Sequence, residues 1–261
     1  MEGSDSALNF AIGLANRLDV VWTFLLLITR FTALVMILPG VGAGERGLMI
    51  RLPAIIVISF ACLIGRESYV PIPPDWGVMM LSVAGELAVG FLLGIVPFLI
   101  VAGVQMGAQI SSTTMGLGVG NLIDPTLGVT TTDLSRILGD LAIIIFLVVG
   151  GHHAIIYAAS GLVDSLPVGQ FLITEDVVGN FIEHAARIFK TGLIISAPVM
   201  VALLLTNFVM ALISRAVPTV NIFMVSFPLT IGIGLILVML SLRDFMAVIE
   251  KLFTQSAPII G

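Results

Sequence analysis

Four charged residues interrupt long apolar stretches of this chain and are the first candidates for chemistry. They are Arg30, Arg51, Glu86 and Asp140. A charge inside an apolar membrane segment is costly, so it marks a charge partner, a buried contact or an ion pathway. Opposite charges can pair between helices, for example Arg30 with Glu86. We favour structural pairing and subunit packing over a proton relay, because a relay needs a chain of titratable groups and this sequence has few.

A second candidate is the stretch 105–133, QMGAQISSTTMGLGVGNLIDPTLGVTTTD, which is rich in glycine and hydroxyl residues. Irregular backbone at membrane depth is tolerated only where protein buries it or where it lines a cavity. The stretch therefore fits a re-entrant or pore-lining loop, and a packed connector between helices is the alternative. Apolar side chains separated by glycines can fill a pore without binding ions. We therefore propose that part of this stretch seals a pore, and we call these residues the proposed seal: Met115, Gly116, Leu117, Gly118, Val119, Gly120 and Leu122.

The patterns of enzymes and of ligand sites are missing from the sequence. The glycines at 116–120 lack the lysine and the setting of a phosphate-binding loop, and no GxSxG motif occurs. His152 and His153 are adjacent, so on a helix they should point about 100° apart and hold one metal ion poorly. His184 is distant and Cys62 is alone, so no zinc-ligand spacing exists. We expect no catalysis, no metal and no cofactor.

Composition and hydropathy indicate the elements that position these residues. The chain is 58% hydrophobic and 10% charged, against about 25% charged in soluble domains, and its mean hydropathy is +1.17. About 20 apolar residues cross a bilayer, and each span should be helical because lipid offers the backbone no partner. The sequence thus predicts an all-α polytopic membrane protein without a separate soluble domain. Its helices should cover about 20–38, 47–65, 77–104, 135–163, 188–213 and 219–242.

The remaining features concern the ends, the packing and the charge of the chain. Residues 1–19 suit a short amphipathic helix on a surface or partner, and their acids do not fit a signal peptide. Pro97 should kink the third helix, and the glycine pairs Gly90/Gly94 and Gly103/Gly107 allow close helix packing. The net charge of −5 and the two lysines give no basic patch, so nucleic acid is not expected. Lysine and arginine counts do not fix the membrane orientation.

Six segments of the chain follow one another in a recognisable order. They are NLIDP at 121–125, LSRILGDL at 134–141, GGHH at 150–153, LPVG at 166–169, SAPV at 196–199 and RAVPTVNIFMVSFPLT at 215–230. Together they resemble the FliR family, whose members are export-gate subunits of type III secretion, and the similarity runs from about residue 20 to 245.

The resemblance implies one copy per gate beside FliP-like and FliQ-like subunits. Residues 1–187 would be a FliP-like part and 188–245 a FliQ-like helical hairpin, with both termini periplasmic. Residues 105–125 match the family's plug, which closes the channel together with a methionine ring from FliP. Relatives can carry phenylalanine where this chain has Val119 and Leu122. The turn at Arg215 and Pro218 would face the cytoplasm and an FlhB-type partner.

The resemblance further implies a role in the channel that carries unfolded export substrates across the bacterial inner membrane. The Asp-Pro plug ending, the Gly-His element and the Arg-x-x-Pro turn favour the flagellar system and its basal body. An injectisome export gate is the alternative. A small secondary transporter is a further one, but it would show two similar halves, and no convincing repeat is visible.

Overall fold

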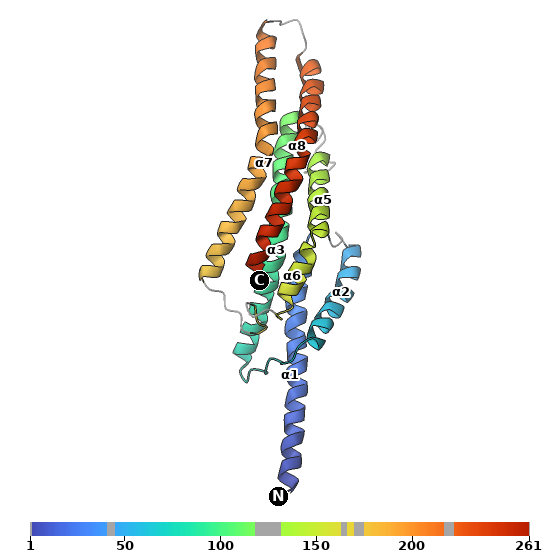
Figure 1. Cartoon of the computed structure of the whole chain (residues 1–261), viewed down its shortest axis with the longest axis vertical. Helices are drawn as coiled ribbons and strands as arrows, with labels where there is room; N and C mark the ends of the chain where they lie inside the picture. Colours follow the sequence, from blue (N-terminus) through green and yellow to red (C-terminus); the bar gives the residue numbers. More distant parts are fainter. Residues whose placement is uncertain are drawn as a thin grey trace. The chain divides into compact units, whose positions relative to one another are not determined.

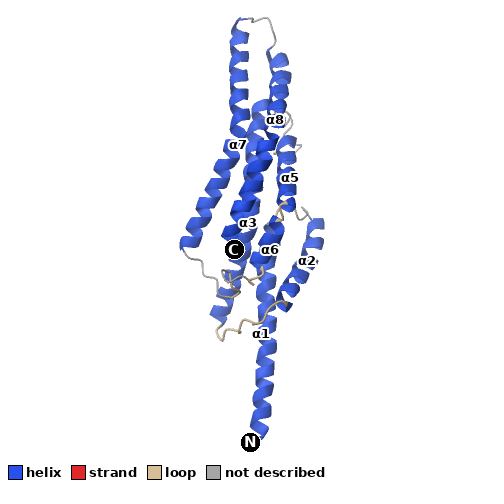
Figure 2. Cartoon of the chain, viewed as in Figure 1, coloured by secondary structure: helices blue, strands red, loops and turns tan. Residues whose placement is uncertain are grey.

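The computed structural model describes residues 2–40, 45–117, 132–162, 166–169, 175–216 and 222–260, and these residues form helices and short connections without any strand (Figure 2). Helical bounds, which Figure 1 locates along the chain, are α1 Glu2–Ile37, α2 Glu45–Ile64, α3 Trp76–Met115, α5 Asp133–Val148, α6 Gly151–Ala159, α7 Glu175–Ala216 and α8 Ile222–Ile260. The predicted all-α fold class is confirmed.

Five helices of the described residues are long and apolar enough to cross a membrane, and α5 with α6 adds a sixth if the pair counts as one span. The five are Arg17–Ile37, Gly47–Ile64, Trp76–Met115, Phe181–Ala216 and Met224–Phe253. These spans agree with the predicted polytopic membrane protein. They also contain Arg30, Arg51 and Glu86.

The helices extend well beyond several predicted bounds. The N-terminal segment is not a separate amphipathic helix, because α1 runs without a break from Glu2 to Ile37. Similarly, α7 begins at Glu175 and α8 continues to Ile260. Hydropathy marks only the part of a helix that suits lipid. The polar ends contain good helix formers such as Glu, Lys and Leu, so the backbone hydrogen bonds continue past the apolar part.

Residues 105–115, predicted to begin an irregular loop, are the last turns of α3. The helix ends where Gly116 takes the left-handed φ of +91°. The Leu117 N–H donates to the Ser112 carbonyl at 3.1 Å and the Gly116 N–H donates to the Thr113 carbonyl at 3.0 Å. This pattern is a Schellman cap, in which glycine is favoured because it lacks a Cβ. The connection from 118 to 131 lies outside the described residues.

The predicted helix at 135–163 is broken into α5 and α6. Gly150 separates them with a left-handed φ of +78°. This φ lies outside the right-handed helical region, so the helix ends there, and glycine adopts it readily because it has no Cβ. By contrast, α3 remains one helix through Pro97.

Two compact units make up the chain: residues 1–98, 150–182 and 256–261 form unit 1, and residues 99–149 and 183–255 form unit 2. In unit 1, α1 packs on α2, with an edge-to-face contact between Phe24 and Phe60 at 6.3 Å. The side chains of Leu26, Phe31 and Leu34 on α1 are fully buried. The core of unit 1 is thus built around α1.

In unit 2, α7 and α8 run alongside each other as a hairpin (Figure 1). Met115 at the end of α3 is fully buried and packs with Val199 and Leu203 of α7. Phe146 of α5 lies against Phe253 of α8, with ring centroids 5.0 Å apart. The second half of α3 is therefore held by both helices of the hairpin and by α5.

Candidate functional site

The ion pair between Arg30 and Glu86 is the centre of the polar site in unit 1. The guanidinium Nε donates to Glu86 Oε2, and Nη2 donates to Oε1 at 3.1 Å. Both side chains are buried, with exposed fractions of 0% and 1%. A bidentate arginine–carboxylate pair is the strongest form of charge-assisted hydrogen bond. The pairing that the sequence suggests between these two residues is confirmed.

Two glycines on α3 bring that helix against α1 next to the pair. A Cβ on Gly90 would collide with the Arg30 carbonyl oxygen and lie 2.9 Å from Ala33 Cβ. A Cβ on Gly94, one turn further, would lie 2.9 Å from the Leu34 carbonyl oxygen. Neither position has room for a side chain. The small-xxx-small pattern therefore serves packing between α1 and α3 within this chain.

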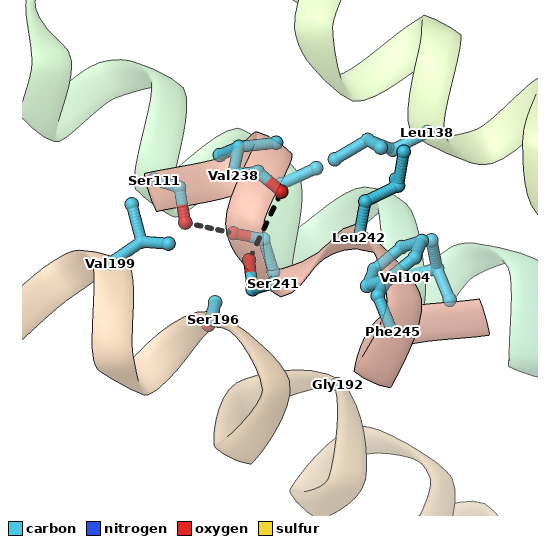
Figure 3. Close-up of a pocket in the computed structure, with 12 residues that line it drawn as sticks. Val104, Ser111, Leu138, Gly192, Ser196, Val199, Val238, Ser241, Leu242 and Phe245 are labelled. Carbon is cyan, nitrogen blue, oxygen red and sulfur yellow. Dashed lines mark hydrogen bonds between the residues drawn. The ribbon is translucent and has the colours of Figure 1, made fainter. Parts of the chain in front are cut away.

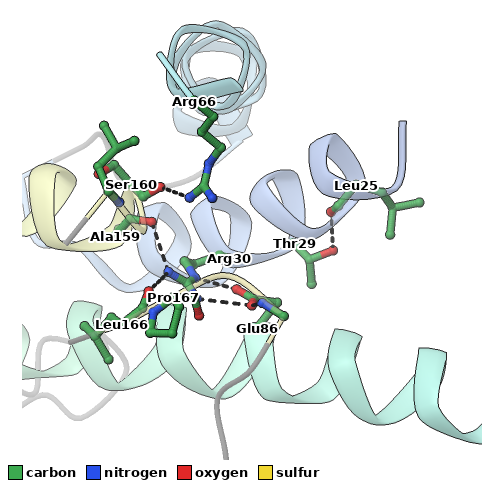
Figure 4. Close-up of polar contacts among 11 residues, drawn as sticks. Leu25, Thr29, Arg30, Arg66, Glu86, Ala159, Ser160, Leu166 and Pro167 are labelled. Atoms are coloured by element: carbon green, nitrogen blue, oxygen red, sulfur yellow. Dashed lines mark hydrogen bonds and ion pairs between the residues drawn. The ribbon is translucent and has the colours of Figure 1, made fainter. Parts of the chain in front are cut away.

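The rest of the Arg30 guanidinium binds the segment that follows α6 (Figure 4). Nη1 donates to the Leu166 carbonyl at 3.0 Å and to the Ala159 carbonyl at 3.4 Å. Nη2 also donates to the Pro167 carbonyl at 3.3 Å. On the carboxylate side, the Gly169 N–H donates to Glu86 Oε1 at 2.6 Å. Both charges are thus surrounded by hydrogen bonds, which offsets the cost of burying them.

Arg66, just after α2, is a member of this site that sequence reasoning missed. Its Nη2 donates to the Ser160 carbonyl, as Figure 4 shows. Burial lowers the pKa of the Arg66 guanidinium, and the positive charge of Arg30 lowers it further, while Cys62 and Glu86 act in the opposite direction. The only sequence signal was its position directly after an apolar span.

This arrangement is suited to fixing structure. The ion pair is surrounded by backbone carbonyls and one backbone amide, and these groups do not titrate. Arginine also stays charged in proteins. We therefore interpret the site as a structural joint between α1, the first half of α3, Ala159 and residues 166–169, all within unit 1.

The other two predicted intramembrane charges lie elsewhere. Arg51 on α2 is half-buried, and its Nη1 donates to the Met36 carbonyl at 3.3 Å. Asp140 lies on α5 with an exposed side chain. Neither residue takes part in the hydrogen bonds described above for the Arg30–Glu86 pair. Whether either packs against another subunit stays a prediction.

Of the proposed seal residues, the structure describes Met115, Gly116 and Leu117; Gly118, Val119, Gly120 and Leu122 lie outside the described residues. The Met115 carbonyl accepts a hydrogen bond from Thr230 Oγ1 of α8 at 3.0 Å. The Met115 side chain also packs against Gly234 of α8, where an added Cβ would lie 2.5 Å from Met115 Cγ. The end of α3, which precedes the 118–131 connection, is therefore fixed to α8.

The end of that connection is fixed to α3. Thr132 donates to Gln109 Oε1 from both its N–H and its hydroxyl, each at 2.9 Å. Ser135 Oγ donates to the Gln105 carbonyl at 2.9 Å, and Gly139 leaves room for the Gln105 side chain. Gln105 and Gln109 lie one turn apart and together hold the start of α5. Sequence reasoning did not single out either glutamine.

The remaining predicted residues give no further cluster. Arg215 is exposed near the end of α7, and Pro218 lies outside the described residues. The rings of His152 and His153 are only 3.9 Å apart, so the expectation that they point well apart is wrong. Side-chain torsions bring the rings together although their Cβ positions diverge. Within the described ranges, no group of three or more His, Cys, Asp or Glu residues could hold a metal ion.

Comparison with known proteins covers almost the whole chain. The family described as "Bacterial export proteins, family 1" matches residues 21–256. Flagellar biosynthetic protein FliR of Aquifex aeolicus (strain VF5) is 30% identical over 255 residues, which are 90% of this chain and 94% of the relative. FliR of Bacillus subtilis (strain 168) is 26% identical, covering 91% and 92%.

A relative with a different name is similar to the same degree. Yop proteins translocation protein T of Yersinia pestis is 26% identical over 235 residues, which are 88% of this chain and 89% of the relative. The region matched by the family contains Arg30, Glu86, Gln109, the whole of α7 and α8 as far as residue 256. The chain belongs to the bacterial export proteins, family 1, the family of FliR.

Proposed function

We propose that this chain is an inner-membrane subunit of a type III secretion export gate and serves flagellum assembly. The observation that carries the proposal is its end-to-end similarity to FliR proteins, 30% identical over 90% of this chain in the Aquifex relative. The five apolar spans support a place in the membrane. An injectisome gate is the second candidate, because the Yersinia translocation protein is 26% identical over a similar length.

The specific partners follow from the FliR resemblance. We propose FliP-like and FliQ-like subunits as neighbours in the gate, an FlhB-type protein at its cytoplasmic mouth, and the flagellar basal body as its location. The exposed apolar surface supports such partners: only 22% of the apolar window in α2 and 11% of that in α8 is buried within this chain. Lipid or other membrane subunits must cover these faces.

The division into a FliP-like part and a FliQ-like hairpin remains our proposal. Its boundary, at residues 187 and 188, falls inside α7, so the hairpin would be a continuous extension of a helix rather than a separate module. The antiparallel run of α7 and α8 supports a hairpin (Figure 1). We propose that Arg215, which is exposed near the end of α7, contacts the FlhB-type partner.

We also propose that the connection beginning at Gly116 is the channel plug. What supports this is that the residues on both sides are anchored: the Met115 carbonyl accepts a hydrogen bond from Thr230 of α8, and the Thr132 N–H donates to Gln109 of α3. A plug must close a channel reproducibly, and fixed ends restrict where its middle can lie. The apolar residues that would seal the pore are those named from the sequence.

Complementation tests the function directly. In a flagellated bacterium that lacks its own FliR, expression of this chain with its cognate FliP-like and FliQ-like subunits should restore swimming in soft agar. The same chain should not restore effector secretion in a Yersinia strain lacking the translocation protein. The reverse result would favour the injectisome. A chain that purifies alone and moves a small solute in vesicles would indicate a transporter instead.

A further inference from the structure

A small cavity in unit 2 lies among α3, α5, α7 and α8 (Figure 3). Its lining is mostly apolar or small, but each of three helices contributes one serine: Ser111 from α3, Ser196 from α7 and Ser241 from α8. Ser111 and Ser196 are more than nine-tenths buried, with exposed fractions of 3% and 5%. The three serines therefore give an otherwise apolar cavity a polar part.

The three hydroxyl protons already have acceptors. Ser111 Oγ donates to the Gly107 carbonyl at 3.1 Å, and Ser196 Oγ donates to the Leu193 carbonyl at 2.9 Å. Ser241 Oγ donates to the Leu237 carbonyl at 2.8 Å. Each oxygen keeps lone pairs that can accept a hydrogen bond. The cavity therefore offers acceptors, and its occupant must be a donor.

Size and charge select the donor. The centre of a water molecule can occupy a volume of about 30 Å³ in this cavity. On the same measure one water molecule needs about 10–15 Å³, and it also needs two to four polar partners. No acidic residue is among the lining side chains, so a cation would bring an unbalanced charge into an apolar site. A neutral hydrogen-bond donor of one or two heavy atoms fits both the volume of the cavity and its uncharged lining.

We propose that this cavity is a water site in which one or two ordered waters donate hydrogen bonds to the serines of α3, α7 and α8. The site lies beside a glycine crossing, where a Cβ on Gly107 would lie 2.6 Å from the Gly192 carbonyl oxygen. Glycines bring the α3 and α7 backbones together but supply no side-chain contact to α8. The water supplies a polar link among the three helices at that level.

The test uses the complete gate complex purified with its partner subunits, at a resolution that shows ordered water. The wild-type complex should have a density peak in the cavity within hydrogen-bond distance of at least two serine oxygens. The double variant Ser196→Ala/Ser241→Ala leaves one acceptor and should lose the peak. Ser214→Ala is the matched control, because Ser214 Oγ makes the same kind of bond, to the Ala211 carbonyl at 2.6 Å, at an exposed position.

An empty cavity in the wild type would overturn the proposal, and so would a peak that persists unchanged in the double variant. Xenon gives a second measurement that works even if the double variant assembles poorly, because dry apolar cavities bind xenon and hydrated ones do not. The wild-type complex under xenon pressure should show no xenon in the cavity. Xenon bound there in the wild type would show that the site is dry.

Discussion

Arg30 on α1 and Glu86 on α3 form a bidentate ion pair that is closed off from solvent, and each partner also binds backbone groups of the segment 166–169. One pair of side chains therefore joins two membrane helices and a connecting segment within unit 1. Removing one partner would leave the other charged and buried, which costs about 3–5 kcal/mol.

For this reason we expect Glu86→Leu to reduce the yield of assembled gate strongly and Glu86→Gln to reduce it less. The amide still accepts hydrogen bonds from Arg30 and from the Gly169 N–H, whereas leucine accepts none. The measurement is the amount of intact complex recovered in detergent and its thermal midpoint. Glu67→Gln, at an exposed carboxylate, is the control. Wild-type yields for both Glu86 variants would contradict a structural role for the pair.

Gly90→Ala should destabilise the chain because the new methyl group would collide with the backbone of α1 at Arg30. A methyl group added at Gly232 in α8 would meet nothing within 4 Å beyond its own stretch of helix, so Gly232→Ala is the matched control. In a helix interior, alanine is favoured over glycine by about 1 kcal/mol. We expect the thermal midpoint to fall for Gly90→Ala and to stay or rise for Gly232→Ala. Equal thermal midpoints for the two variants would show that α1 and α3 move apart easily enough to accommodate the added methyl group.

Gln109→Leu should weaken the attachment of α5 to α3. The Thr132 N–H and hydroxyl would both lose their acceptor, and each unsatisfied buried donor costs about 1–3 kcal/mol. Met106→Leu, at an exposed position on the same helix, should have little effect. Limited proteolysis between α3 and α5 in the assembled complex measures the change. Cleavage of the Gln109→Leu variant at the wild-type rate would mean that other contacts hold the start of α5 against α3.

Production of the chain alone should give little stable protein, because large apolar faces of α2, α7 and α8 are uncovered within the chain. Co-expression with the proposed FliP-like and FliQ-like subunits should raise the detergent-soluble yield sharply. Size-exclusion chromatography and native mass spectrometry report the result. A monodisperse, stable monomer obtained without partners would contradict the assembly.

Deletion of residues 116–120 tests the proposed plug. If these residues seal the channel, the gate should still assemble but leak small ions, and induction should slow growth. Conductance across membranes containing the complex measures the leak, with the wild-type complex as reference. A variant that assembles and stays tight would show that the seal lies elsewhere. Loss of assembly would indicate a packed connector between α3 and α5.

Much of the architecture was decided by the sequence itself. Membrane helices form their hydrogen bonds locally, so apolar stretches at 20–38, 47–65 and 77–104 were enough to predict where α1, α2 and α3 lie. The predicted positions of the helix ends were less accurate. Hydropathy identifies only the part of a helix that suits lipid, whereas α7 and α8 continue through polar residues. The break at Gly150 depends on one backbone torsion, which composition does not reveal.

The polar sites needed the tertiary structure. Arg30 and Glu86 were recognisable because a charge in an apolar span is conspicuous, and their opposite signs suggested the pair. The carbonyls of Ala159, Leu166 and Pro167, which complete the site, have no side-chain signature. Gln105, Gln109 and the three cavity serines carry no charge, so they do not stand out in an apolar span as Arg30 and Glu86 do. Only the close approach of helices distant in sequence showed which of these ordinary polar groups meet.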